Sequence, residues 1–406
     1  MTIVYVIGLD IGQHELPKTI RDHILNADVL VGGQRLLDRF KTYKGKKTVI
    51  KGPIKDLINR IKDELESGRT VTVLADGDPL FFGIGKQLVN LIDANRIVFH
   101  PGITTLQAAA AREKLSWENI KTVSLHGRDN LLPLLQTLIS HDMVGVYTDN
   151  TFTPSRIAQK LIKTGIDIFS MTVFENLGER NEKISNLSLS EAAQKDFSPL
   201  NFILLRRTGH PEIPLKIGID DDLYIHQKGL ITKKEVRAVG LAMLSIEDHH
   251  VVWDLGAGCG SVGIEASLLS RKGMVISVEK DTKRCEMIRK NIKKTGSWTV
   301  SVVNSTMPEG LDRLPEPDRI FIGGGLKNDI KILEKAASLL KTGGRLVIHT
   351  ILLKSLNQAS SFFEKMSWPY SITEVTASRS QKLAGELYLR SLNPVFIVTA
   401  SKINEY

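Results

Sequence analysis

The chain has 406 residues, of which 42% are hydrophobic and 24% are charged, and its formal net charge is +9. This length predicts two domains, and the composition excludes a disordered or fibrous chain and indicates globular domains with a hydrophobic core. The sequence holds no apolar run of membrane-spanning length and no lysine/arginine tract of nucleic-acid-arm density, so we expect neither a membrane nor a nucleic acid as a partner.

The two cysteines, Cys259 and Cys285, lack metal-ligand spacing and form no disulfide framework. The apolar run at residues 3–7 is too short for the core of a signal peptide and has no basic leader. A reducing compartment is the simplest setting for such a chain. We therefore expect a cytoplasmic protein without a metal site.

Strand and helix patterns alternate through the first half, which is typical of α/β folds. An apolar strand is predicted at residues 3–7, and a helix that begins at Pro53 has one apolar face. Further strands are predicted at 70–74 and 97–99, with a helix at 107–112. Glycine-rich loops follow these strands at residues 8–12, 75–83 and 100–105, where open α/β sheets bind ligands.

Four more strands are predicted near residues 122–125, 143–148, 169–174 and 201–205, with helical patterns between the first three. Residues 208–214 then contain a glycine, two prolines and no hydrophobic period. This composition predicts a linker between two domains.

The second half opens with Thr232 and Glu235, whose spacing fits a capping box ahead of an apolar helical face. A strand at 251–255 leads into a glycine turn and a helix at 264–269. The remaining strands are predicted at 275–278, 300–303, 319–322, 345–350, 372–376 and 395–399. Residues 377–390 are expected to form a segment that overhangs the carboxyl edge of the sheet.

The glycine turn after residues 251–255 carries the strongest chemical signal. Asp254, Gly256, Gly258 and Gly260 fit the acid-x-Gly-x-Gly-x-Gly pattern of loops that bind S-adenosylmethionine (SAM). The glycines at 258, 260 and 263 also fit a dinucleotide fingerprint, and a ligand-free tight turn is a third interpretation. The acidic residue favours SAM, and Glu279 at the end of the next strand suits ribose hydroxyls in either case.

Longer motifs point to one family. Residues 1–207 resemble the tetrapyrrole methylases, and residues 221–406 resemble a decarboxylating methylase that acts on carbon 15 of a cobalamin precursor. The similar stretches are Gly8–Gly12, Gly77–Gly83, Pro101–Thr104, His126–Asp129, Glu175–Gly178, Thr232–Arg237, the Asp254 turn, Ile322–Gly325 and Asn393–Phe396. The whole chain is thus similar to the fused, decarboxylating precorrin-6B C-methyltransferases.

This resemblance implies an α/β architecture. A two-lobed tetrapyrrole-methylase domain (residues 1–207) is followed by a linker (208–220) and a Rossmann-like, class I SAM-dependent methyltransferase domain (221–406). It also implies an enzyme that methylates carbons 5 and 15 of a precorrin or cobalt-precorrin and decarboxylates the ring C acetate side chain. We expect a homo-oligomer, whose number of subunits the sequence leaves open. The presence of cobalt in the substrate and the order of the two methylations stay open.

The candidate site residues follow from these patterns and from the resemblance. Those expected to bind SAM are Gly8, Asp78, Pro79, Gly83, Gly102, Thr104, Thr105, Thr232, Asp254, Gly256, Ala257, Gly258, Cys259, Gly260, Glu279 and Met307. The glycines Gly323, Gly324 and Gly325 suit a flat ligand that lies against the backbone, or a plain tight turn. Arg379, Lys382 and Arg390 are expected to meet substrate carboxylates unless they form a solvated loop.

His349, at the end of a strand, is a candidate acid for the decarboxylation, and a core histidine is the alternative. The sequence departs from the family pattern at Asp10 and Ile11 in the first loop, at Asp76, and at Asn304–Met307. Three other functions fit the glycine turn: an RNA or protein methyltransferase with an N-terminal recognition domain, a non-catalytic SAM-binding module, and a dehydrogenase.

Overall fold

The computed structural model describes residues 2–12, 15–227, 229–323 and 330–403. The chain divides into two compact units. The first comprises Met1–Gly127, Asp142–Ile157 and Ser170–Arg206, and the second comprises Arg128–His141, Ala158–Phe169 and Arg207–Tyr406. Among the described residues, none of the helices combines the length and the apolar character that crossing a bilayer requires.

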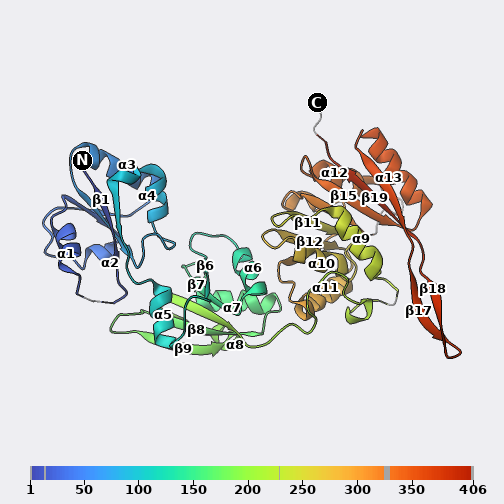
Figure 1. The fold of residues 1–406 in the computed structure, drawn as a ribbon, viewed down its shortest axis with the longest axis horizontal. Helices are drawn as coiled ribbons and strands as arrows, with labels where there is room; N and C mark the ends of the chain where they lie inside the picture. The colour runs from blue at the N-terminus through green and yellow to red at the C-terminus, as the bar shows by residue number, and fades with distance from the viewer. Residues whose placement is uncertain (1, 13–14, 228, 324–329, 404–406) are drawn as a thin grey trace. The chain divides into compact units, whose positions relative to one another are not determined.

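The first sheet is parallel throughout and has the strand order β3-β2-β4-β1-β5 (Figure 1). Strands β4 and β5 flank β1, so the loops that follow these three strands emerge side by side at one edge. The strands are β1 (Val4–Leu9), β2 (Val29–Gly32), β3 (Lys46–Val49), β4 (Val71–Asp76) and β5 (Ile97–His100). The helices are α1 (Lys18–Leu25), α2 (Gln34–Leu37), α3 (Ile54–Glu66), α4 (Gly85–Leu91) and α5 (Thr105–Glu113).

The second sheet mixes parallel and antiparallel pairs in the order β6-β7-β10-β8-β9. Its strands are β6 (Lys121–Ser124), β7 (Met143–Tyr147), β8 (Phe169–Glu175), β9 (Lys183–Ser188) and β10 (Asn201–Arg207), with helices α6 (Leu132–Ser140), α7 (Pro154–Lys163) and α8 (Leu189–Ala192). Strand β9 was not predicted, because it is a mostly exposed edge strand without a clear apolar alternation.

The third sheet, in the second unit, has the order β13-β12-β11-β14-β15-β19-β16. The strands β13, β12, β11, β14 and β15 run parallel to one another, and β19 is antiparallel to both of its neighbours, β15 and β16. The strands are β11 (Val251–Leu255), β12 (Met274–Glu279), β13 (Val300–Asn304), β14 (Arg319–Ile322), β15 (Arg345–Thr350), β16 (Tyr370–Val375) and β19 (Val395–Ser401). Chain order reverses between β11 and β14, which makes this edge the topological switch point where open α/β sheets bind ligands.

Helices cover this sheet and complete its core. They are α9 (Lys234–Leu244), α10 (Ser261–Leu269), α11 (Thr282–Thr295), α12 (Ile330–Leu339) and α13 (Leu353–Lys365). Trp253 and Ile320 from the sheet pack in one buried cluster with Leu333 of α12 and Phe363 of α13. Helix α10 passes close to the sheet at Gly263, where an added Cβ would lie 2.9 Å from Oδ2 of Asp254. The predicted α/β fold is therefore confirmed, with a Rossmann-like sheet in the second half.

One segment of the second half has a structure that the sequence analysis did not specify, and one local expectation is wrong. The segment at 377–390 is a two-stranded hairpin, β17 (Ser378–Leu383) and β18 (Glu386–Ser391). The hairpin lies between β16 and β19 in the chain, and Figure 1 shows it extending away from the third sheet. The capping box is also absent: Lys233 occupies the N-cap of α9 without a side-chain bond, and the carboxylate of Glu235 pairs with Arg379 instead.

Candidate functional site

The turn after β11 has a backbone that only glycine adopts readily. Gly256, Gly258 and Gly260 have φ angles of 72°, 59° and 82°, a region in which a Cβ clashes with the backbone. Gly260 is the N-cap of α10 and donates its N–H to the carbonyl of Ala257 at 2.8 Å. No described atom lies within 4 Å of a Cβ added at Gly258. Bare backbone at the start of α10 is thus open to a ligand.

Two buried carboxylates hold this turn in place. Oδ2 of Asp254 accepts the N–H of Gly263 at 2.9 Å, and burial raises the pKa of Asp254 to about 7. Oε2 of Glu279 accepts the N–H of Gly258 at 2.9 Å, while its Oε1 accepts the N–H of Asp281 at 3.0 Å. A carboxylate has about four acceptor positions, so each keeps acceptor capacity beyond these bonds.

A cavity of about 1060 Å³ opens at the switch point. Its wall includes the glycine turn, Gly323 after β14, His349 at the end of β15, and Arg379 and Arg390 of the hairpin. Of the residues expected to bind SAM in this half, those in the wall are Thr232, Asp254, Gly256, Ala257, Gly258 and Cys259. The structure therefore brings together residues from segments more than 150 positions apart in the sequence.

The other predicted residues of this half lie elsewhere. Gly260 and Glu279 stand behind the wall: an added Cβ at Gly260 would meet Ile288 at 2.7 Å, and Glu279 is bonded to the wall residue Gly258. Met307 packs against the core cluster of the sheet. Gly324 and Gly325 lie outside the described residues. The glycine turn and cavity offer open backbone and the N-terminus of α10, with carboxylate oxygens as acceptors beside them.

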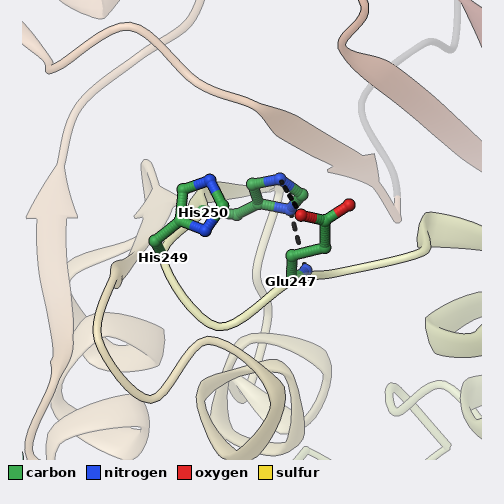
Figure 2. Close-up of side chains that lie close together, drawn as sticks. All are labelled: Glu247, His249 and His250. Atoms are coloured by element: carbon green, nitrogen blue, oxygen red, sulfur yellow. Dashed lines mark hydrogen bonds and ion pairs between the residues drawn. The ribbon is translucent and has the colours of Figure 1, made fainter.

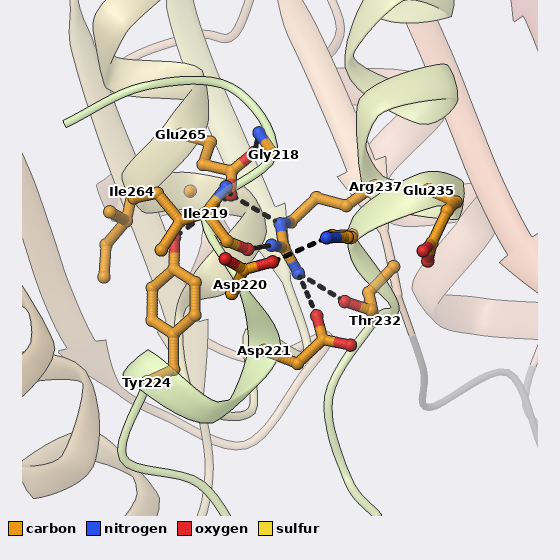
Figure 3. Close-up of polar contacts among 12 residues, drawn as sticks. Gly218, Ile219, Asp220, Asp221, Tyr224, Thr232, Glu235, Arg237, Ile264 and Glu265 are labelled. Carbon is orange, nitrogen blue, oxygen red and sulfur yellow. Dashed lines mark hydrogen bonds and ion pairs between the residues drawn. The ribbon is translucent and has the colours of Figure 1, made fainter. Parts of the chain in front are cut away.

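A buried ion-pair network that the sequence analysis missed joins α9 and α10 (Figure 3). Arg237 of α9 and Glu265 of α10 are both fully buried, and Nε of Arg237 donates to Oε1 of Glu265 at 2.7 Å. Arg237 also donates to Asp221 and to the carbonyls of Ile219 and Thr232. The sequence did contain a signal for this network, since Arg237 and Glu265 are opposite charges within otherwise apolar helical segments. Buried charges are almost always paired, so these two could have been expected to form an ion pair.

Glu265 also fixes part of the predicted linker. Its carboxylate accepts the N–H groups of Gly218 and Ile219 at 2.9 and 3.1 Å and the hydroxyl of Tyr224 at 3.2 Å. The segment that leads to the cavity wall at Gly229–Lys233 is thereby anchored to α9 and α10. The domain boundary itself stays a prediction.

Arg379 is engaged by the protein's own carboxylates. Its guanidinium forms a bidentate pair with Glu235 at 2.9 and 2.6 Å and contacts Asp221 at 2.8 Å, and the hydrogen bonds to these residues raise its pKa. This pairing argues against Arg379 as the residue that meets substrate carboxylates. It instead ties the hairpin to the start of α9, and through Asp221 to Arg237.

The hairpin places its other two cations on opposite faces. Arg390 pairs with Arg379 across the two strands and lines the cavity, whereas Lys382 pairs with Leu387 and is not part of the wall. Side chains alternate between faces along a strand, so Lys382 points away from Arg379. Among the described residues, no carboxylate forms an ion pair with Arg390.

His349 is a buried, neutral side chain. It is 8% exposed, its ring stands edge-on to Phe321 at 4.6 Å, and a Cβ at Gly240 would lie 2.3 Å from its Nε2. Neither ring nitrogen has a hydrogen-bond partner among the described residues, and burial lowers its pKa to about 3. A neutral imidazole is a poor proton donor, which argues against the predicted role as an acid.

In the first unit, the glycine loops after β1, β4 and β5 pack backbone against backbone. A Cβ at Gly8 would lie 2.0 Å from the carbonyl oxygen of Gly77 and 2.5 Å from the nitrogen of Gly102. The carboxylate of Asp10, which departs from the family pattern, accepts the N–H of Ile103 at 2.6 Å. Asp76, the second departure, pairs with Arg35. Asp10 therefore joins the loop after β1 to the loop after β5, whereas Asp76 joins the end of β4 to α2.

The side chains predicted to bind SAM in these loops also have structural bonds. Oδ1 of Asp78 accepts the N–H of Leu80 at 2.8 Å, and Thr104 caps α5 in a capping box with Gln107. Gly83 lies against Pro79, where an added Cβ would be 2.4 Å from the Pro79 carbonyl oxygen. Thr105 opens α5 directly after Thr104.

A separate group, Glu247, His249 and His250, has potential metal-ligand atoms within 4.8 Å of one another (Figure 2). It precedes β11 and so lies at the opposite edge of the sheet from the cavity. Nδ1 of His250 accepts the N–H of Glu247 at 2.8 Å, so this nitrogen is not available to a metal. The neutral His250 ring then carries its proton on Nε2, which is not a free ligand atom either. We therefore assign no metal to this group.

Sequence comparison matches each half to a different family. Residues 4–193 match the tetrapyrrole (corrin/porphyrin) methylases, and residues 222–402 match the precorrin methyltransferase domain.

Relatives cover both halves together and separately. A precorrin-6Y C(5,15)-methyltransferase [decarboxylating] of Sinorhizobium is 35% identical over 289 residues, which are 70% of this chain and 69% of the relative. A probable cobalt-precorrin-6B C(15)-methyltransferase (decarboxylating) of Sulfurisphaera tokodaii is 36% identical over 46% of this chain and 97% of its own length. A probable cobalt-precorrin-7 C(5)-methyltransferase of Methanocaldococcus jannaschii is 36% identical over 49% of this chain and 95% of its own length. With two different methylase folds in one chain, each bearing its glycine loops, the chain belongs to the decarboxylating precorrin-6Y C(5,15)-methyltransferase family.

Proposed function

We propose that the chain is a bifunctional, SAM-dependent C-methyltransferase that acts on carbons 5 and 15 of a precorrin or cobalt-precorrin and removes the carboxyl group of the ring C acetate. The observation that carries the proposal is the presence of two unrelated sets of ligand-binding loops. One set joins the loops after β1, β4 and β5, and the other lines the cavity at the switch point of the third sheet. This arrangement favours a fused methylase over an RNA methyltransferase, for which the first unit would be a recognition domain.

SAM supplies an electrophilic methyl group, and the electron-rich carbon of the macrocycle is the nucleophile. The chain needs no nucleophilic side chain, only a cavity that holds the two reacting carbons at attack distance and excludes water. Such positioning contributes ~7–11 kcal/mol in favourable intramolecular cases. In the second half, the turn from Gly256 to Gly260 would hold the cofactor, and Gly323 and Arg390 would face the macrocycle.

In the decarboxylation, the bond between the acetate methylene and its carboxyl carbon breaks, CO₂ leaves, and a proton adds to the methylene carbon. The macrocycle accepts the electron pair, so the reaction requires no metal at the protein. The apolar part of the cavity wall, including Phe321 and Leu352, would favour loss of the charged carboxylate by withholding water from it.

We expect two SAM molecules to bind per chain, because the two sets of loops are independent. Isothermal titration of the full chain with SAM should give a stoichiometry near two. In the Glu279→Ala variant, the SAM affinity of the first half should stay unchanged, while the affinity of the second half falls. The wild-type enzyme is supplied separately with metal-free and with cobalt-containing substrate. With at least one of these two substrates it should transfer two methyl groups and release CO₂. Absence of methyl transfer from both substrates would contradict the function.

Arg390 is expected to bind a substrate carboxylate, since it lines the cavity and has no carboxylate partner among the described residues. Arg390→Ala should raise the apparent KM for the corrinoid in carbon 15 methylation by about tenfold, because a charge-assisted bond contributes ~1.5–3 kcal/mol. The SAM affinity should not change, and the penalty should shrink at high salt.

Lys382→Ala is the matched control for Arg390→Ala, because it removes a cation from the opposite face of the same hairpin. It should leave the corrinoid KM unchanged. Equal effects of the two variants would mean that the hairpin attracts substrate only by its overall charge.

The assembly and location of the chain are also proposals. The face of the hairpin opposite the cavity exposes Leu387 and Leu389, each more than 70% accessible, and this apolar surface supports a homo-oligomer. Cys259 and Cys285 are both free and buried, which supports a reducing compartment such as the cytoplasm.

A further inference from the structure

One exposed aromatic residue in the first unit has an unusual backbone. Phe82, in the loop after β4, has a φ of 56°, in the left-handed region that bulky side chains avoid. Such conformations are strained and concentrate at functional sites. The Phe82 side chain is also 55% exposed, so burial of its ring does not compensate for the strain.

Neighbouring aromatic rings hold Phe82 on one side. Its ring lies 5.0 Å from that of Phe81 and 5.5 Å from that of Tyr147, and Tyr147 packs in turn on Phe202 at 5.0 Å. Tyr147 belongs to the end of β7 and is partly buried, and its desolvation raises its pKa to about 12. The inner side of Phe82 is therefore fixed by a packed cluster, while the rest of the ring faces outward.

The loops around Phe82 expose further apolar surface. Leu80, in the same turn, is 54% exposed, and Ile103, in the loop after β5, is 47% exposed. Ile103 belongs to the packed loops, since a Cβ at Gly77 would lie 3.1 Å from its carbonyl oxygen. Large apolar side chains thus rise from the loops whose backbones are packed against Gly8 and Gly102.

We propose that the exposed face of Phe82 is a stacking platform for the flat macrocycle at the carbon 5 methylation site, with Leu80 and Ile103 extending the apolar surface. This inference rests on the proposed function, which supplies a substrate with a broad apolar face and charged groups at its rim. SAM has only the smaller adenine as a flat group, and its other parts are polar or charged. The macrocycle is therefore the ligand that matches this apolar surface.

The backbone strain at Phe82 separates a binding role from a structural one. Glycine adopts a positive φ without strain, so Phe82→Gly should raise the midpoint of thermal unfolding or leave it unchanged. The same variant should raise the corrinoid KM for carbon 5 methylation by about tenfold, since stacking of a flat ring on an aromatic side chain is worth ~1–3 kcal/mol. Phe82→Tyr should retain the wild-type KM.

The experiment uses the full chain with carbon-13-methyl SAM, so that NMR of the product reports each methylated carbon separately. Carbon 15 methylation is the internal control and should be unchanged in every variant at saturating substrate. Trp117→Ala is the matched control, because Trp117 is 50% exposed and lies beyond the far end of α5. It should leave both methylations unchanged.

The outcomes discriminate clearly. A wild-type chain that does not methylate carbon 5 would contradict the proposed function, not the platform. With an active wild type, an unchanged corrinoid KM in Phe82→Gly would overturn the platform. A rise in the KM for SAM instead of that for the corrinoid would assign the ring to adenine, and would also overturn it.

Discussion

Replacing Arg237 by methionine is expected to lower the free energy of unfolding of the second half by about 3–5 kcal/mol. Arg237 is fully buried, and its loss would leave the equally buried carboxylate of Glu265 without its cation. Desolvation of an unpaired charge is far more costly than the loss of an ordinary hydrogen bond. Urea unfolding followed by tryptophan fluorescence measures the effect, because Trp253, Trp298 and Trp368 all lie in the second half.

Two further variants test the explanation. Arg271→Met removes a 73% exposed arginine that pairs with Asp248, and it should cost less than about 1 kcal/mol because solvent screens such pairs. The double variant Arg237→Met with Glu265→Gln removes the charge of both partners and should recover much of the loss, as replaced buried pairs often do. A double variant no more stable than Arg237→Met would show that packing, not charge, dominates.

Glu279→Ala is expected to weaken SAM binding to the second half by about tenfold to a hundredfold. The carboxylate accepts the Gly258 N–H at the centre of the glycine turn, and its remaining oxygen positions suit ribose hydroxyls. Each charge-assisted bond contributes ~1.5–3 kcal/mol before compensation. Titration with SAM should show one weakened site and one unchanged site, and carbon 15 methylation should fall under limiting SAM.

A deoxyribose analogue of SAM separates the two roles of Glu279. If the carboxylate binds the ribose, the analogue should bind the wild-type second site weakly and lose little further affinity in Glu279→Ala. If Glu279 only shapes the turn, the variant should weaken SAM and the analogue by equal factors. Glu279→Asp is a useful comparison, since it retains the charge but shortens the reach to Gly258.

Local patterns in the sequence were sufficient for most strands and for the glycine turn. The apolar run before Asp254 and the glycines at 256, 258 and 260 appear in the structure as β11 and as three residues of positive φ. The amphipathic pattern after Pro53 likewise appears as α3, with Leu57 and Ile61 buried. These features depend on backbone preferences and on side-chain periodicity, which neighbouring residues specify.

Edge elements with mixed exposure escaped the same approach. Strand β9 and the hairpin β17–β18 are mostly exposed, so neither has the alternation of buried and exposed residues that identifies a strand. Their strands are defined by pairing with a partner, Ser170 to Ser188 and Ser378 to Ser391 at the ends of the two registers. Backbone pairing of this kind depends on which segments meet.

The sequence by itself determined the family, most of the strands and the place of the glycine turn. Only the tertiary structure decided which charged groups are available to a ligand. Arg379 lies 144 positions from Glu235 and 158 from Asp221, yet its guanidinium is bound to both, while Arg390 across the hairpin has no ion-pair partner among the described residues. The physical reason is that the role of a charged side chain depends on its ion-pair partners and on its burial. Residues distant in the sequence set both, and they thereby determine whether the side chain binds substrate or stabilises the fold.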